Sequence, residues 1–434
     1  MKLELEKAIY GGACLAHQTE GDDAGKTVFV PFTLPGEIIE ASLIEQRDSF
    51  EEASLDRVLT ASQDRVQPKC SHFGQCGGCH YQHAAYPAQV RMKESILRET
   101  LKRAGLQEFP AIQIHCGEPW AYRSRTRLRL IELGATFRVG YNQRGSNQFL
   151  AIHECPILEP LLWRAVKVLL QVAEEDSAAA QWLRNAVEVE LFTNSEETSL
   201  QMTLFVRKQQ TGFGALCERM KERIPELTGA GVSLLTPAGL QRRTGRPHQL
   251  GSWGAEGLVY RAADEDYWVS RGGFFQTNRF LVDELVRLVT GKRTGTTAWD
   301  LYAGVGLFSR ALAKSFRQVV AVEASANELS TTFRGQGRRP VEATTVAFLR
   351  GAVVQRERPE LIVVDPPRAG LGAEVCGLLG RVAAPEIVYV SCDPVTLARD
   401  LKSLADAGYS VMELHMVDMF PQTFHLETVV VLRR

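Results

Sequence analysis

A cysteine that follows a predicted buried strand is the first residue in this sequence that could carry chemistry. In IVYVSCDPVTLARDL, residues 387–401, an apolar run leads into Cys392, and a helical pattern begins after Pro394. A partly exposed thiol at a strand end, just before a helix N-terminus and with cations nearby, is expected to have a lowered pKa and to act as a nucleophile. The alternative is a buried cysteine that packs as a small hydrophobic side chain.

A glycine-containing turn lies earlier in the chain, in DLYAGVGLFS. Gly304 and Gly306 separate a predicted strand from a predicted helix, and Glu323 ends the next strand 19 residues after Gly304. Glycines let the backbone approach a ligand at a helix N-terminus, and an acid at about this distance commonly binds ribose hydroxyls. Ser309 occupies the third-glycine position of a dinucleotide fingerprint, so the pattern favours a nucleoside-bearing cofactor over NAD.

An aspartate ends another apolar strand in LIVVDPPRAGL. Asp365 is followed by two prolines, which stiffen the turn and fix the carboxylate in the crevice where such sheets bind ligands. The alternative is that Asp-Pro is simply a turn opener.

These strand ends belong to a regular alternation of apolar strands and helices that begins at about residue 274. Such alternation indicates a parallel sheet covered by helices on both faces, a doubly wound α/β domain. The last 26 residues predict two final strands, interpreted as an antiparallel hairpin at the sheet edge.

Three cysteines lie close together near residue 75. Cys70, Cys76 and Cys79 have the spacing Cys-x5-Cys-x2-Cys, next to two glycines. Thiolates at this spacing are suited to zinc or to an iron–sulfur cluster, and both need a fourth ligand. The spacing differs from the Cys-x3-Cys-x2-Cys of radical S-adenosylmethionine enzymes, so radical chemistry is not assigned.

Four arginines alternate in YRSRTRLRL. Arg123, Arg125, Arg127 and Arg129 are two residues apart and therefore lie on one face of a strand. A solvated edge strand is one interpretation. Four guanidinium groups on one face repel one another unless phosphates lie opposite, so contact with a nucleic acid is favoured.

The composition is that of an ordinary soluble protein of several domains. At 434 residues the chain is too long for one core, and its formal net charge of −1 requires local patches for any nucleic-acid binding. Residues 1–62 predict short strands that form a small β-barrel. No apolar run reaches the ~20 residues of a membrane span, and the N-terminus lacks a signal peptide's apolar block, so a cytoplasmic protein is expected.

Taken together, the motifs DLYAGVGLFS, VDPPRAGL, YVSCDPVTLARDL and HLETVVVL closely resemble the S-adenosylmethionine-dependent RNA 5-methyluridine methyltransferases. The resemblance spans essentially the whole chain and is weakest in the middle. Its first residues look like the family's TRAM domain, an OB-like β-barrel. Its cysteine stretch looks like the family's iron–sulfur motif.

The resemblance implies roles for particular residues. Cys392 would add to carbon 6 of uracil, and Glu427, otherwise an unremarkable strand-edge charge, would remove the carbon-5 proton. Cys155 would complete a 4Fe–4S cluster with the three clustered cysteines. One position departs from the family, because Leu307 stands where relatives often have Asn. The positions that match cofactor contacts are Gln276, Tyr302, Gly304, Gly306, Glu323 and Asp365.

The expected architecture is multidomain. Residues 1–62 form the TRAM barrel, 63–270 an α+β central domain with the iron–sulfur motif and RNA-binding residues, and 271–434 a Rossmann-like methyltransferase domain. A helix over 88–105 is expected to pack on the last of these. The expected activity is methyl transfer from S-adenosylmethionine to carbon 5 of a uridine, with 23S rRNA favoured and tRNA the alternative, by a cytoplasmic monomer that has no membrane partner.

Two further hypotheses stay open. An amino-methyltransferase would also use Asp-Pro-Pro but would need neither Cys392 nor Glu427. A noncatalytic iron–sulfur protein would bind RNA without transferring a methyl group.

Overall fold

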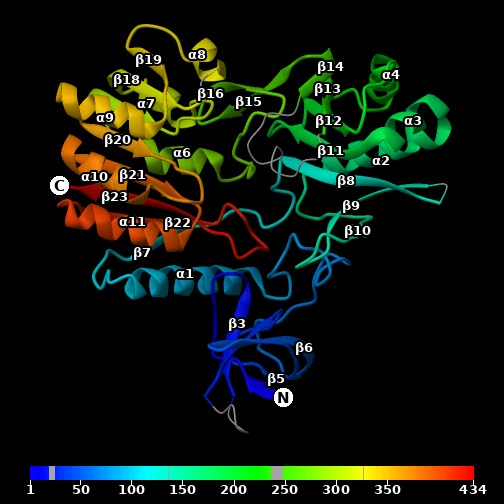
Figure 1. The fold of residues 1–434 in the computed structure, drawn as a ribbon, viewed down its shortest axis with the longest axis horizontal. Coiled ribbons are helices and arrows are strands. Elements are labelled where there is room, and N and C mark those ends of the chain that lie inside the picture. The colour runs from blue at the N-terminus through cyan, green and yellow to red at the C-terminus, as the bar shows by residue number, and fades with distance from the viewer. Residues whose placement is uncertain (19–24, 135, 236–247, 326) are drawn as a thin grey trace. The chain divides into compact units, whose positions relative to one another are not determined.

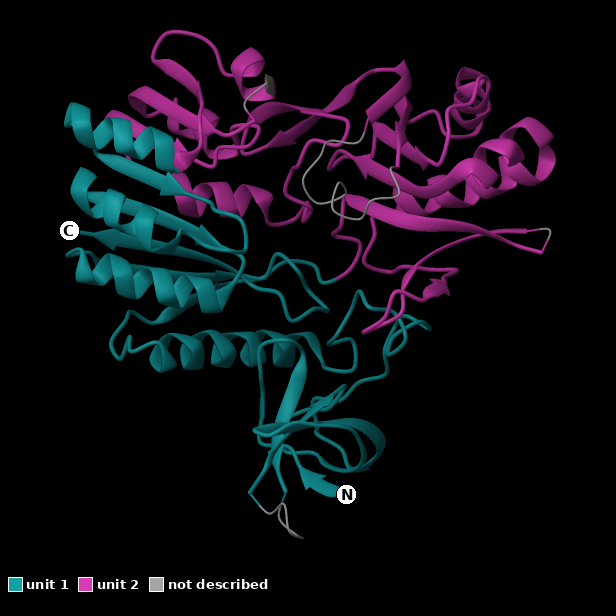
Figure 2. Ribbon diagram, in the orientation of Figure 1, with its two compact units in different colours: residues 1–119, 346–434 teal, residues 120–345 magenta. Residues whose placement is uncertain are grey.

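The computed structural model describes residues 1–18, 25–134, 136–235, 248–325 and 327–434. The chain forms two compact units (Figure 2): unit 1 comprises residues 1–119 and 346–434, and unit 2 comprises residues 120–345. These units group the residues differently from the three ranges expected from the sequence, which remain predictions about independent domains.

Unit 1 begins with a curled sheet of six strands, which agrees with the short strands predicted for residues 1–62. Alternating residues such as Val28 and Val30 are fully buried, as expected of strands with one face on a core. In the order β1-β5-β6-β4-β3-β2, neighbouring strands are hydrogen-bonded. The strands are β1 (Lys2–Glu4), β2 (Lys7–Ala8), β3 (Ala13–His17), β4 (Thr27–Pro31), β5 (Ile38–Gln46) and β6 (Phe50–Thr60).

The rest of unit 1 is an α/β layer built from both ends of the chain (Figure 1). Its strands follow one another in the order β20-β21-β23-β22-β7. They are β7 (Ile112–His115), β20 (Leu361–Val364), β21 (Glu386–Ser391), β22 (Ser410–Val417) and β23 (Glu427–Arg433). The helices are α1 (Tyr86–Arg103), α9 (Thr345–Gln355), which begins at the last residue of unit 2, α10 (Gly372–Val382) and α11 (Pro394–Asp406), and α1 packs against α11.

The last two strands correct one expectation. β22 and β23 form the predicted antiparallel hairpin, but it does not lie at the sheet edge. β23 lies between β21 and β22, and β7 pairs with the outer side of β22. The short segment 112–115 therefore covers the edge, a pairing over about 300 residues that local periodicity cannot reveal.

Unit 2 contains a seven-stranded sheet with helices on one face (Figure 1). The helices pack on an apolar core that includes Leu128, Val189 and Leu204. The strand order is β10-β9-β8-β11-β12-β13-β14. The strands are β8 (Arg125–Leu133), β9 (Thr136–Asn142), β10 (Phe149–Ala151), β11 (Ala186–Thr193), β12 (Leu200–Val206), β13 (Leu227–Leu234) and β14 (His248–Gly254), and the helices are α2 (Pro160–Glu175), α3 (Ser177–Asn185) and α4 (Phe213–Arg223).

The remainder of unit 2 supplies the glycine turn. Strands β17 and β18 are parallel, as are β18 and β19, which agrees with the predicted α/β alternation. A hairpin of β15 and β16 precedes them. The elements are β15 (Gly257–Ala262), β16 (Glu265–Ser270), α6 (Val282–Thr290), β17 (Gly295–Leu301), α7 (Leu307–Leu312), β18 (Phe316–Glu323), α8 (Asn327–Thr332) and β19 (Arg338–Glu342).

Among the described residues, no helix combines the length and the apolar character that a membrane crossing requires.

Candidate active site

Two residues that lie 35 positions apart in the sequence meet at one end of the unit 1 sheet. β21 and β23 pair antiparallel, with Ser391 opposite Thr428, and the Thr428 hydroxyl donates to the Ser391 carbonyl at 3.0 Å. The next residue along β21 is Cys392, and the residue that precedes Thr428 on β23 is Glu427. The antiparallel register therefore places the thiol and the carboxyl side by side at the same strand ends.

Asp365 and Arg368 lie in the same neighbourhood. β20 is parallel to β21, so Asp365 leaves its strand at the end where Cys392 leaves β21. The Arg368 backbone carbonyl accepts a hydrogen bond from the Thr396 hydroxyl at 3.1 Å, and its guanidinium Nη2 lies 3.4 Å from both ring nitrogens of His425. Unit 1 alone therefore brings together a thiol, two carboxyl groups, a guanidinium and an imidazole.

The pKa of Cys392 is shifted in the opposite direction from that expected from the sequence. Burial, together with the charges of Glu427 and Asp365, raises the pKa of this thiol to about 11, although Arg368 acts to lower it. The expectation of a lowered pKa was wrong because it counted the helix N-terminus and overlooked desolvation and two carboxylates.

Glu427 is almost completely buried, with 3% of its surface exposed. Burial raises its pKa well above the ordinary value for a glutamate; the charge of Asp365 adds to this effect, and Arg368 opposes it. A carboxylate with a raised pKa is a stronger proton acceptor than an exposed one, which suits a general base.

The turn that carries Cys392 is held by the helix that follows and by the N-terminal sheet region. Asp393 caps α11, because its carboxylate accepts from the backbone N–H groups of Val395 and Thr396 at 3.0 and 2.9 Å. The hydroxyl of Tyr10 donates to the same carboxylate at 3.1 Å. Burial and the charge of Asp393 raise the pKa of Tyr10, so its hydroxyl stays a donor.

In unit 2, the structure brings together the glycine turn and the acid predicted to accompany it. Glu323 ends β18, and its carboxylate accepts from the Gly304 N–H at 3.0 Å. Tyr302, Gly304 and Gly306 have φ angles of 65°, 55° and 87°, in the left-handed region that side chains rarely adopt. The turn before α7 is therefore strained at Tyr302, as is common where a backbone approaches a ligand.

A buried aspartate supports this turn and was not singled out in the sequence. Asp300 is fully buried near the end of β17 and accepts from the hydroxyl of Ser309, the residue at the third-glycine position. Burial raises the pKa of Asp300 to about 7, and the hydrogen bond from Ser309 partly offsets this. Leu307, the departure from the family, buries its side chain at the start of α7, and its carbonyl accepts from the Tyr267 hydroxyl at 2.9 Å.

Gln276, the remaining position matched to a cofactor contact, lies in unit 2 in the segment after β16 and is buried, with 7% exposure. Its contact with a cofactor remains a prediction.

The arginine row lies on the face of the seven-stranded sheet opposite the helices. Arg125 and Arg127 lie two residues apart on β8, and both donate to glutamates of β11, at 3.2 Å to Glu190 and 2.6 Å to Glu188. The Arg127 guanidinium also stacks over the Phe205 ring at 3.7 Å. The argument that these arginines need phosphates to relieve mutual repulsion therefore fails, because carboxylates across the strands already balance their charge.

The other two arginines differ from this pair. Arg129 donates to Asn142 and to the carbonyl of Asn147, at 2.9 and 2.8 Å. Arg123 precedes the strand and forms isolated bridges with Leu158 and Asn278. The row on β8 therefore has three members.

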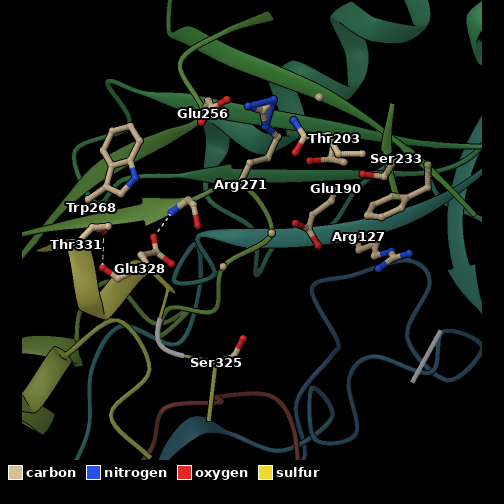
Figure 3. Close-up of a pocket in the computed structure, with 16 residues that line it drawn as sticks. Arg127, Glu190, Thr203, Ser233, Glu256, Trp268, Arg271, Ser325, Glu328 and Thr331 are labelled. Atoms are coloured by element: carbon tan, nitrogen blue, oxygen red, sulfur yellow. Dashed lines mark hydrogen bonds between the residues drawn. The ribbon is translucent and has the colours of Figure 1, made fainter. Parts of the chain in front are cut away.

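A pocket of about 560 Å³ opens over this sheet face (Figure 3). Arg127, Glu190 and Thr203 lie next to one another across β8, β11 and β12, and Trp268 and Glu328 line another part of the pocket. The Glu328 carboxylate accepts from the Ser270 N–H. The lining of the pocket holds three glutamates and two arginines, so carboxylates outnumber guanidinium groups there.

The clustered cysteines share one loop of unit 1, and each is half-buried. Burial raises the pKa of the Cys76 thiol, so a thiolate there would need a cation nearby. Cys155, the implied fourth ligand, belongs to unit 2. The thiol donors suit a metal or an iron–sulfur cluster, but no group of three or more His, Cys, Asp or Glu side chains in the described ranges is arranged to hold a metal ion.

Comparison with known proteins places these observations in a family. A family model described as tRNA (Uracil-5-)-methyltransferase matches residues 343–434. A 23S rRNA (uracil(1939)-C(5))-methyltransferase RlmD from Halomonas elongata is 32% identical over 96% of this chain and 88% of that protein. An uncharacterized RNA methyltransferase from Aquifex aeolicus is 30% identical over 100% of this chain and 98% of that protein.

A solved structure shows the same fold. The Pyrococcus abyssi tRNA (uracil-54, C5)-methyltransferase, in complex with S-adenosyl-L-homocysteine, superposes with a TM-score of 0.76 at 22% identity, covering 99% of each chain. With the relatives above, this likeness agrees with the Rossmann-like sheet and the curled N-terminal sheet described here. The chain belongs to the RNA (uracil-5)-methyltransferase family and is an enzyme of that class.

The raised pKa of Cys392 leads to a prediction about its reactivity. In protein without cofactor, alkylation of Cys392 by iodoacetamide should keep rising about tenfold per pH unit up to about pH 10, because the thiolate fraction grows until the pH passes the pKa of about 11. Mass spectrometry of the peptide that contains residue 392 measures this rate. Free cysteine, the control, levels off near pH 9. A plateau for Cys392 below pH 8 would contradict the assignment.

Proposed function

We propose that this enzyme transfers a methyl group from S-adenosylmethionine to carbon 5 of a uridine in 23S rRNA, through a covalent adduct between Cys392 and the uracil. The observation that carries the proposal is the register of β21 and β23, which sets the Cys392 thiol beside the buried Glu427 carboxyl. Uracil C5 methylation needs this pair of groups, a nucleophile and a base, in one desolvated place.

The chemistry assigns the formation and cleavage of a covalent bond to Cys392 and one proton transfer to Glu427. The Cys392 thiolate forms a bond to carbon 6, and the electron pair of the 5,6 double bond moves into an enolate. Carbon 5 then takes the methyl group from the sulfonium, which leaves S-adenosylhomocysteine. Glu427 accepts the carbon-5 proton, the carbon–sulfur bond breaks, and the double bond is restored with Cys392 released.

The surroundings of Cys392 and Glu427 set the pKa of each group. The resting thiol is protonated, because its pKa is about 11. Arg368 lowers the pKa of both Cys392 and Glu427. The positive sulfonium of the methyl donor would act in the same direction on the thiol, which couples nucleophile activation to cofactor binding.

The methyl donor is assigned to the glycine turn of unit 2 on the chemistry of its donors. The Glu323 carboxylate lies at the Gly304 N–H, where ribose hydroxyls are commonly bound in such folds. Gln276, Tyr302 and Gly306 are proposed as further contacts to the cofactor, and the family resemblance implies the same role for Asp365.

The choice of RNA rests on the relatives. Those named RlmD act on 23S rRNA by name and match nearly the whole chain, whereas the P. abyssi tRNA enzyme resembles it in fold at lower identity. We therefore favour 23S rRNA over tRNA. Methyl transfer from labelled cofactor to unmodified 23S rRNA, but not to unmodified tRNA, distinguishes the two.

The first test separates the roles of the two catalytic residues. Cys392→Ala should abolish methylation and adduct formation while cofactor and RNA still bind. Glu427→Gln should transfer the methyl group but retain the carbon-5 proton, so methylated RNA stays joined to the protein as a slow band on a denaturing gel. An adduct with Cys392→Ala, or normal turnover of Glu427→Gln, would reject the respective assignment; in the second case His425 is the next base to test.

A 4Fe–4S cluster on Cys70, Cys76, Cys79 and Cys155 is proposed from the spacing and the family resemblance. No step of the methylation is assigned to it, because the reaction transfers no net electrons. Anaerobically purified protein should be brown, with about four irons per chain, and Cys155→Ser should bleach it. Stoichiometric zinc without visible absorbance would reject the cluster, and Cys217→Ser, which removes a buried cysteine of unit 2, serves as the control.

The arginine row is proposed to contact RNA phosphates from its more exposed members. Arg127→Ala with Arg129→Ala should weaken RNA binding and reduce the slope of log affinity against log salt by about one to two, because each phosphate contact contributes roughly 0.7 to 0.9. Glu188→Gln, which leaves Arg127 in place but removes its partner, should not reduce the slope. An unchanged slope in the double variant would return these arginines to a structural role in the sheet.

A further inference from the structure

The catalytic base stands at the end of a loop with no regular structure. Residues 418–426 join β22 to β23, and Glu427 follows at once, opposite Val417 in the register of the hairpin. Most of this loop is buried, although it forms neither helix nor strand. A buried irregular segment needs partners outside itself to fix its shape, since its backbone groups have no ladder to complete.

One partner is a lysine of α1. The Lys93 ammonium donates to the Asp418 carboxylate at 2.5 Å and to the Phe420 carbonyl at 3.0 Å. The side chains of Lys93 and Asp418 have no exposed surface. This ion pair fixes the beginning of the loop, where it leaves β22.

A second partner, one turn earlier on α1, holds the middle of the loop. The Gln89 side chain accepts from the Gln422 backbone N–H at 2.9 Å and donates to the Gln422 side-chain oxygen at 3.0 Å. Gln422 has a φ of 68°, an uncommon conformation for a residue with a side chain. Its carbonyl accepts from the N–H groups of His80 and Tyr81 at 2.8 and 3.0 Å. Gln422 is thus clamped from two directions.

The nucleophile also has supports that Gln89 and Lys93 do not contact directly. Cys392 follows β21 directly, and the next residue, Asp393, is fixed as the cap of α11 and by the hydroxyl of Tyr10. None of the hydrogen bonds that Gln89 and Lys93 make to the loop involves this turn. Gln89 and Lys93 therefore act on the loop directly and reach the turn of Cys392 only through other residues, such as Phe424, whose ring centroid lies 5.3 Å from that of Tyr10.

We propose that Gln89 and Lys93 are positioning residues for the proton-abstraction step, because they hold the 418–426 loop that delivers Glu427 to the carbon-5 proton. This inference rests on the proposed covalent mechanism and adds to it a defined support for one step. Loss of these contacts slows release of the product more than addition of the thiol. The covalent, methylated intermediate then accumulates.

The test uses the full-length enzyme and ordinary uridine-containing RNA. Gln89→Met keeps the size of the side chain and its helix propensity but removes the bonds to Gln422. Turnover should fall about tenfold or more, with a covalent RNA–protein band that wild type lacks at steady state and with unchanged KM for RNA and cofactor. Melting temperature and covalent fraction are measured on the same samples.

The ion pair is tested with a paired variant, since Lys93→Met alone would leave a buried carboxylate without its counter-ion and could prevent folding. Lys93→Met with Asp418→Leu removes both charges and keeps an apolar fill, but the Phe420 carbonyl loses its donor. This variant should also accumulate the adduct. The single variant Lys93→Arg keeps Asp418, the positive charge and a donor. It should turn over faster than the paired variant.

A matched control separates loss of position from loss of stability. Tyr409→Phe removes another buried hydrogen bond of unit 1, from the Tyr409 hydroxyl to the Ala384 carbonyl at 2.9 Å, away from the loop. It should lower the melting temperature without accumulation of adduct.

Two comparisons keep the outcomes distinct. If neither wild type with 5-fluorouridine RNA nor Glu427→Gln forms an adduct, the covalent mechanism itself is wrong. If both do, the inference is overturned by variants at Gln89 and Lys93 that turn over normally, or that lose turnover without an excess of adduct over the Tyr409→Phe control.

Discussion

The proposed active site depends on one register, the antiparallel pairing of β23 with β21. Val429, Val430, Val431 and Leu432 are all buried, so both faces of β23 are committed to the core. A slip of one residue would exchange these faces and carry Glu427 away from Cys392. The backbone position of Glu427, the proposed base, relative to Cys392, the proposed nucleophile, is thus set by apolar packing along the strand, and the 418–426 loop acts on the orientation of the Glu427 side chain in our proposal. No direct bond between the two groups is needed to place them.

The same burial sets the electrostatics of the site. Desolvation raises the pKa of both Cys392 and Glu427, and Asp365 adds a negative charge that raises each further. A resting site of this kind holds its protons, so the thiol is unreactive and Glu427 must lose its proton before it can act as a base. The charge of Arg368 partly opposes the rise in both pKa values. Its guanidinium Nη2 also lies 3.4 Å from a ring nitrogen of His425. The buried site disfavours the thiolate of Cys392. In the proposed mechanism the positive sulfonium of the methyl donor would stabilise that thiolate when the donor binds.

The fold and the strand-end residues could be predicted from sequence because each depends on local pattern. Apolar strands alternating with helices gave the α/β layer, and the glycine turn with Glu323 followed from spacing that the Gly304–Glu323 hydrogen bond now explains. Contacts between distant segments could not be read in this way. The pairing of β7 with β22, the glutamates opposite the arginine row and the raised pKa of Cys392 all depend on neighbours from other strands. The role of Glu427 as the proton acceptor came only from the family resemblance, since the residue alone looks like a strand-edge charge.

Buried polar side chains of the N-terminal segment pair with buried polar groups of the C-terminal segment, and these pairs hold the two parts of unit 1 together. Lys93 and Asp418 are 325 residues apart and have no exposed surface, and breaking a buried pair of this kind typically costs about 3–5 kcal/mol. Gln89 and Gln422 are 333 residues apart and share two hydrogen bonds. The N-terminal segment therefore forms part of the structure that supports the α/β layer of unit 1. It supplies the groups that hold an irregular loop, and in our proposal that loop orients the Glu427 carboxyl.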